Sequence, residues 1–104
     1  PEVKISAGPG ARIDFVCRVD SDSTRASVHK YADGVEIAYA IGTVPPASPK
    51  ATNLKEFFST AKFSIKGDVA DAGKKLYAYL RWKNNSNSDN SGPWSKPLST
   101  VIFD

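Results

Sequence analysis

The 104-residue chain contains no methionine, a single cysteine, Cys17, and a single histidine, His29. One cysteine excludes an intrachain disulfide and any zinc site built from several cysteines. A lone cysteine on the apolar side of a strand is usually a small core residue rather than a reactive thiol. The stability of the folded chain must therefore come from its hydrophobic core.

Long apolar runs are also absent, so no segment is long enough to span a bilayer or to act as a signal peptide. The formal net charge is only +3, from 14 Lys and Arg against 11 Asp and Glu. Basic and acidic residues are interspersed, which predicts neither nucleic-acid binding nor membrane binding. A chain that begins at Pro1 without methionine is expected to be a fragment of a longer one, and its cellular location stays unknown.

Few residues are suited to catalysis, which needs convergent polar groups with matched proton affinities. An inward-facing Cys17 would not readily meet His29 at a solvent-open site, which disfavours a Cys–His nucleophile pair. We expect His29 to be a surface or boundary residue. The sequence also has no phosphate-binding glycine loop, no GxSxG motif and no zinc motif. We therefore predict a protein that is not an enzyme on its own and that requires no cofactor.

The chain does contain short stretches with two-residue alternation, separated by turn signals. We expect strands at residues 2–6, 12–20, within 26–41, and at 62–66, 76–84 and 96–103. Residues 54–59 fit either an edge strand or one helical turn. The proline-rich stretch 44–49 cannot form a central strand, because proline donates no ladder hydrogen bond. The connection at 67–73 fits a short helical turn around Val69.

About seven strands at this spacing predict a single all-β domain over residues 1–104, an antiparallel sandwich of two sheets. Alternation in the segment 76–84 places Leu76, Ala78, Leu80 and Trp82 inside. The predicted core comprises Ile13, Phe15, Cys17, Val35, Ile37, Tyr39, Phe63, Ile65, Leu80 and Trp82.

The segment 76–95 resembles strands F and G of a fibronectin type III domain. Gly73 is followed by apolar residues in the family's phase up to Asn84, and Gly92-Pro93-Trp94-Ser95 matches the family's entry to strand G. Residues 32–41 look like its strand C. The chain departs from the family where Leu76 replaces the corner tyrosine of strand F, and where Phe15 and Cys17 replace the strand B tryptophan. The resemblance implies a seven-stranded fibronectin type III or immunoglobulin-like sandwich.

The chain is also similar to the fibronectin-like segment at the end of some uncharacterised bacterial proteins. These proteins carry a similar Asp-Gly-Val-Glu-Ile, found here at 33–37, and a similar Gly-Pro-Trp-Ser, found here at 92–95. This likeness implies a bacterial accessory module and brings no known activity with it.

A candidate binding surface lies on the outer face of the segment 76–84. Its residues would be Tyr77, Tyr79, Arg81 and Lys83, with Trp94 beneath the Arg81 guanidinium. The small side chains of Ala38 and Ala40 would leave a shallow aromatic shelf beside the tyrosines. The face could equally be an ordinary half-buried surface on which tyrosines pack against long side chains.

Three functions are conceivable for a domain with such a face. The leading prediction is a non-catalytic accessory module that spaces or docks neighbouring domains, or another protein, through protein contacts. The alternative is a carbohydrate-binding module that uses the exposed tyrosines. A catalytic domain is the third and the least favoured.

Calcium is the only metal with candidate ligands. Asp20, Asp22, Asn87 and Asp89 lie in two loops that would meet at one end of the predicted sandwich. Aspartate, asparagine and serine also form turns without any metal, and no glutamate falls at a suitable spacing for bidentate ligation. The sequence therefore predicts no metal site.

Overall fold

The computed structural model describes residues 1–19, 29, 32–86 and 91–103. Within these described residues, seven strands and two short 3₁₀ turns follow one another. The strands are β1 (Glu2–Gly8), β2 (Arg12–Arg18), β3 (Gly34–Gly42), β4 (Leu54–Phe58), β5 (Lys62–Lys66), β6 (Lys75–Lys83) and β7 (Leu98–Val101). The 3₁₀ turns are η1 (Pro49–Ala51) and η2 (Val69–Asp71).

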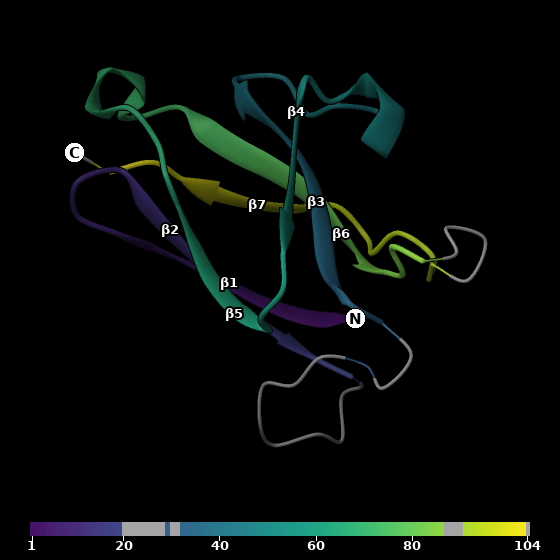
Figure 1. Ribbon diagram of the computed structural model, residues 1–104. Coiled ribbons are helices and arrows are strands. Elements are labelled where there is room, and N and C mark those ends of the chain that lie inside the picture. The colour runs from purple at the N-terminus through teal and green to yellow at the C-terminus, as the bar shows by residue number, and fades with distance from the viewer. Residues whose placement is uncertain (20–28, 30–31, 87–90, 104) are drawn as a thin grey trace.

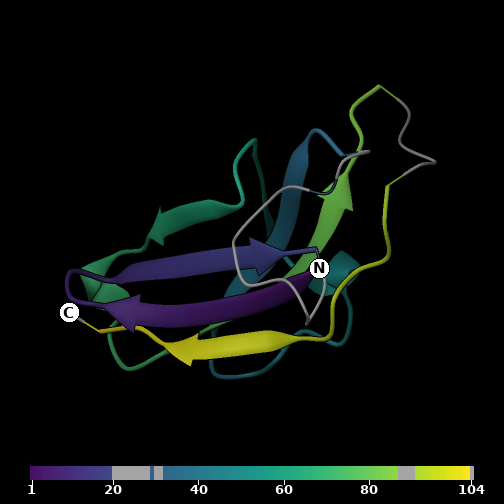
Figure 2. The ribbon, with the colours of Figure 1, turned by 90° about the horizontal axis from the view of Figure 1, so that it is seen from below.

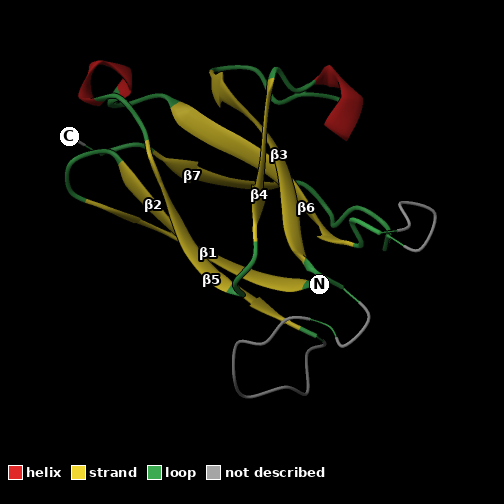
Figure 3. Ribbon diagram, viewed as in Figure 1, coloured by secondary structure: helices red, strands yellow, loops and turns green. Residues whose placement is uncertain are grey.

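The strands form two antiparallel sheets packed face to face, as Figure 1 and the rotated view in Figure 2 show. One sheet has the order β1-β2-β5 and the other has the order β4-β3-β6-β7. The predicted all-β, two-sheet sandwich of seven strands is therefore confirmed. Figure 3 shows that the only helical segments of the described residues are the two short turns η1 and η2.

The core lies between the two sheets and is formed by alternate residues of each strand. All ten residues predicted to be in the core are buried there. The inward phase of β6 is confirmed, because Leu76, Ala78, Leu80 and Trp82 all belong to this cluster. The rings of Phe15 and Phe63 stack across neighbouring strands with centroids 5.1 Å apart.

Residues 54–58 form an edge strand, one of the two alternatives that the sequence left open, because β3 pairs with them over its first half. Several strand boundaries differ from the sequence prediction. The strand that begins at Arg12 stops at Arg18, and the last strand begins only at Leu98. Prolines 93 and 97 flank the segment before β7, and proline cannot donate to a ladder.

The two ends of the chain leave the sandwich from opposite ends of its strands (Figures 1 and 2). The molecule measures 38 × 29 × 20 Å along its principal axes.

Candidate interaction face

The outer face of the four-stranded sheet carries the residues that the sequence singled out. Glu36 on β3 lies directly between Phe57 on β4 and Arg81 on β6 in the strand register. Trp94, in the segment before β7, lies on the far side of Arg81. We call these four residues the cross-strand row. It runs across the sheet with an aromatic side chain at each end and an ion pair between them.

Arg81 holds the row together through two contacts. Its Nε donates a hydrogen bond to Glu36 Oε1 at 2.7 Å. Its guanidinium carbon lies 4.6 Å from the centroid of the Trp94 ring, which is a cation–π geometry and confirms the expected placement. Lys83 joins from two residues further along β6, with Nζ 3.8 Å from Glu36 Oε2. The carboxylate of Glu36 therefore forms ion pairs with two cationic side chains, Arg81 and Lys83.

Trp94 reaches Arg81 because the segment before β7 runs beside β6 with an extra residue. Gly92 N donates to the Trp82 carbonyl at 2.9 Å, and Ser95 N donates to the Leu80 carbonyl at 2.7 Å. Two residues of β6 thus oppose three residues of the incoming segment, as in a β-bulge. Ser95 Oγ accepts a hydrogen bond from Leu80 N at 3.1 Å and so replaces a ladder carbonyl. The bulge aims the Trp94 side chain over Arg81.

Phe57 at the other end of the row was not identified from the sequence. It remains 42% exposed although it is a large aromatic residue. Its ring covers Gly34, where an added Cβ would lie 2.8 Å from Phe57 Cζ. In a strand, Lys55 and Phe57 share one face, while Leu54 and Glu56 share the other. This alternation would have placed Phe57 on the outer face, but only if residues 54–58 had been assigned as a strand.

The burial of Tyr79 shows that one prediction about this face was wrong. Its side chain does belong to the outer face, opposite Ala38, but it is only 6% exposed. Its hydroxyl donates a hydrogen bond to the Pro46 carbonyl at 2.9 Å, so the connection between β3 and β4 covers it. The predicted shelf beside Ala38 is therefore filled by the chain itself. An open platform of two tyrosines does not exist.

Tyr77 and Lys83 remain partly exposed on this face, as predicted. Tyr77 lies between Ala40 on β3 and Ser99 on β7. The described part of the face carries an excess of positive charge, from Lys55, Lys75, Arg81 and Lys83 against Glu36.

The thiol and the metal candidates lie elsewhere. Cys17 is fully buried, and desolvation raises the pKa of its thiol to about 11, against a smaller lowering by the N-terminal amine. His29 lies near Trp82, with ring centroids 6.3 Å apart. All four candidate calcium ligands, Asp20, Asp22, Asn87 and Asp89, lie outside the described residues. The described ranges contain no cluster of three or more His, Cys, Asp or Glu that could hold a metal.

Within the described residues, no helix is long and apolar enough to cross a membrane. Comparison with protein-family models gives no match for the chain, and comparison with curated proteins gives none either.

Proposed function

We propose that the chain is a non-catalytic, fibronectin type III-like module that makes protein contacts through the outer face of its four-stranded sheet. The partner is a neighbouring domain or another protein with an acidic surface. The observation that carries this proposal is the cross-strand row of Phe57, Glu36, Arg81 and Trp94. Aromatic residues and arginine are enriched in protein interfaces and dominate their binding energy.

The row is already ordered before any partner binds. Arg81 is held by Glu36 at 2.7 Å and by the Trp94 ring, so little side-chain entropy remains to be lost on association. The basic residues around the row would attract an acidic partner and would make the association rate depend on salt. The proposed contact is therefore a rigid aromatic and arginine patch within a basic surround.

Two features of the fold support the fibronectin type III-like part of the proposal. The pairs β2–β5 and β3–β6 join strands that are distant in sequence, as Greek-key connections between two sheets do. The chain ends also leave at opposite ends of the sandwich (Figure 1), which suits a module that spaces other domains along a polypeptide.

Carbohydrate binding is the alternative, and it has less support. It was based on two exposed tyrosines, and Tyr79 is covered by Pro46. Only Tyr77 remains partly exposed from that pair. A glycan array tests this alternative directly, and binding that is lost on Tyr77→Ala would favour it over protein contact.

A photo-crosslinking amino acid placed at Phe57 in the producing cell tests the main proposal. The matched control carries the same group at Ser64, an exposed position on β5 in the other sheet. The captured protein is then purified and titrated against wild type, Arg81→Ala and Trp94→Ala. We expect crosslinks from position 57 only, and an affinity loss of about tenfold or more for each variant. Equal crosslinking from both positions, or unchanged affinity in both variants, contradicts the proposal.

A further inference from the structure

A second exposed feature lies on the open side of the sandwich, between β4 and β5. Each of these strands ends its own sheet. They meet near the turn that joins them, where the rings of Phe58 and Phe63 stack with centroids 4.2 Å apart. From that point the strands diverge (Figure 1), and an open groove of about 650 Å³ lies between them. We call this groove the β4–β5 wedge.

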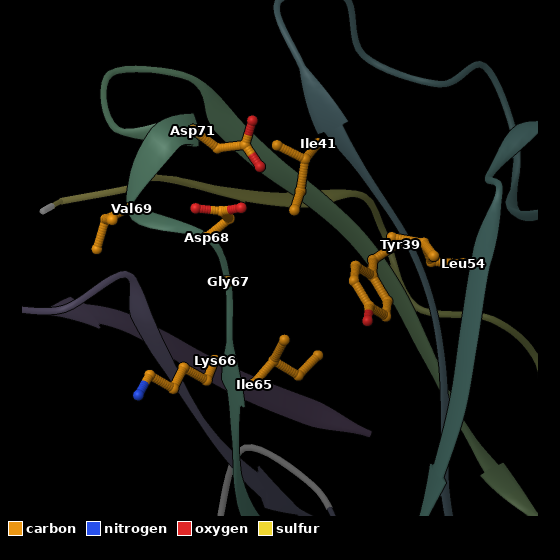
Figure 4. A pocket seen from close by; sticks show the side chains of 9 residues that line it. All are labelled: Tyr39, Ile41, Leu54, Ile65, Lys66, Gly67, Asp68, Val69 and Asp71. Atoms are coloured by element: carbon orange, nitrogen blue, oxygen red, sulfur yellow. The ribbon is translucent and has the colours of Figure 1, made fainter.

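The wedge is lined mainly by apolar side chains. Ile41, Leu54, Ile65 and Val69 contribute to it together with the ring of Tyr39 (Figure 4). Leu54 is 38% exposed and Val69 is 57% exposed. A concave apolar lining with a few convergent polar groups is the usual composition of a ligand site.

Its charged lining residues are Asp68, Asp71 and Lys66. Figure 4 shows the carboxylates of Asp68 and Asp71 turned toward the interior of the wedge, while the Lys66 amine turns away from it. Asp71 pairs with Lys74 at 3.1 Å, and Asp68 accepts a hydrogen bond from Ala70 N at 2.9 Å. Both carboxylates keep further acceptor positions.

Glu56 adds a third carboxylate at the edge of the wedge. It lies between Leu54 and Phe58 on β4, so alternation places it on the inner face of the strand, and it accepts a hydrogen bond from the Tyr39 hydroxyl. Three carboxylates against two amines leave one net negative charge around the wedge, where Lys74 is paired with Asp71 and the Lys66 amine turns away.

We propose that the β4–β5 wedge binds an extended basic peptide from another protein, which adds as a strand to the free edge of β4. A strand at the end of a sheet presents backbone N–H and C=O groups that an extended peptide can pair with. Alternate side chains of the peptide then enter the wedge. A lysine or arginine opposite Glu56 pairs with that carboxylate and approaches Asp68 and Asp71.

A second copy of the chain is a poorer occupant. Antiparallel pairing of two β4 strands centred on Glu56 would place that residue opposite its own copy. Pairing centred on Lys55 would do the same with two lysines. Like charges directly opposite each other destabilise a strand pair, whereas a basic peptide meets the carboxylates with complementary charge. This site is independent of the cross-strand row and does not rest on it.

The test is an amide chemical-shift titration of the ¹⁵N-labelled chain with short synthetic peptides. The probe alternates threonine with valine and carries one central lysine on the valine face. One comparison peptide has glutamate in place of the lysine. Another keeps the lysine but is N-methylated at the amides that would face β4. We expect saturable shifts at residues 54–58 and 67–71, and about fivefold tighter binding of the lysine peptide than of the glutamate peptide.

The N-methylated peptide should lose saturable binding, because its backbone can no longer donate to the strand edge. Glu56→Gln should reduce the preference for lysine, whereas the matched control Glu2→Gln, an exposed carboxylate on β1, should leave it unchanged. The proposal is overturned if the lysine peptide gives no saturable shifts at millimolar concentration, or if the N-methylated peptide binds equally well. Shifts centred on Arg81 and Trp94 would also overturn it, and would instead support protein contact through the cross-strand row.

Discussion

The hydroxyl of Tyr79 donates a hydrogen bond to the carbonyl of Pro46, 2.9 Å away and 33 residues earlier in the chain. Through this hydrogen bond, the connection between β3 and β4 packs against the outer face of the sheet. It also explains why Ala38 is fully buried although its side chain belongs to an outer face. The small alanine leaves space that the chain fills with its own connection.

Tyr79→Phe should lower the free energy of unfolding by about 0.5–1.5 kcal/mol, because it removes one part-buried hydrogen bond and leaves the Pro46 carbonyl without that donor. Urea denaturation measures the change. The control is Tyr77→Phe on the same strand and face, which should change stability by less. Equal losses in the two variants would contradict the role assigned to the Tyr79 hydroxyl.

Gly34→Ala should be destabilising by about 1–3 kcal/mol, because overpacking forces neighbouring atoms to move. A Cβ there would overlap the Phe58 carbonyl oxygen and lie 2.8 Å from Phe57 Cζ. Gly42→Ala, at the other end of β3, is the matched control, since no atom lies within 4 Å of its added Cβ. Thermal unfolding of both variants distinguishes close packing at Gly34 from a general need for glycine in β3.

The two tryptophans should differ strongly in their effect on stability. Trp82 belongs to the core, so Trp82→Ala should cost about 3–5 kcal/mol and leave the domain marginally folded. Trp94 is half-buried and contacts Arg81 on an outer face, so Trp94→Ala should cost about 1 kcal/mol from the lost cation–π contact and packing. A Trp82→Ala protein as stable as wild type would refute the inward phase of β6.

Stability should fall at alkaline pH because of the buried thiol. Desolvation raises the pKa of Cys17 from 9.0 to about 11. Above pH 9 the unfolded chain loses this proton while the folded chain keeps it, so the folded state binds more protons and the free energy of unfolding falls as pH rises. A shift of this size corresponds to about 2–3 kcal/mol lost between pH 9 and pH 11.

Urea denaturation across this pH range measures the loss. Cys17→Ala should be less stable at neutral pH, because it leaves a cavity, but its stability should decline less steeply above pH 9. A decline equally steep in the variant would show that other groups cause it. The folded wild-type thiol should also resist a disulfide reagent at pH 8, where it is buried and protonated.

Glu56→Val should make the chain self-associate. An inward-pointing charge on an edge strand opposes pairing with another edge, and valine would replace it with a residue of high strand propensity. Sedimentation velocity at increasing concentration should show dimers or larger species. Glu56→Lys, which keeps a charge at the same position, should remain monomeric. If both variants stay monomeric at high concentration, Glu56 does not protect this edge.

Much of the fold was readable from the sequence because the period-two alternation is strong. Every second residue from Leu76 to Trp82 and from Ile13 to Cys17 is apolar, and only Val16 breaks the pattern on the opposite face. A strand with one buried face permits only one assignment of such a pattern. The turn residues then separated the strands. The sequence left the structure of residues 54–58 open because Leu54, Phe57 and Phe58 do not share one face of a strand. The segment forms a strand because it pairs with β3, and its own side chains are mostly exposed.

The sequence alone determined which side of each central strand faces the core, since that depends only on the spacing of apolar side chains along one segment. Tertiary structure decided what covers the other side. The burial of Tyr79 by Pro46, the meeting of Phe57, Glu36, Arg81 and Trp94 in one row, and the wedge between β4 and β5 all depend on contacts between segments distant in sequence. Local alternation carries no information about such contacts, because strand order and the paths of connections set them.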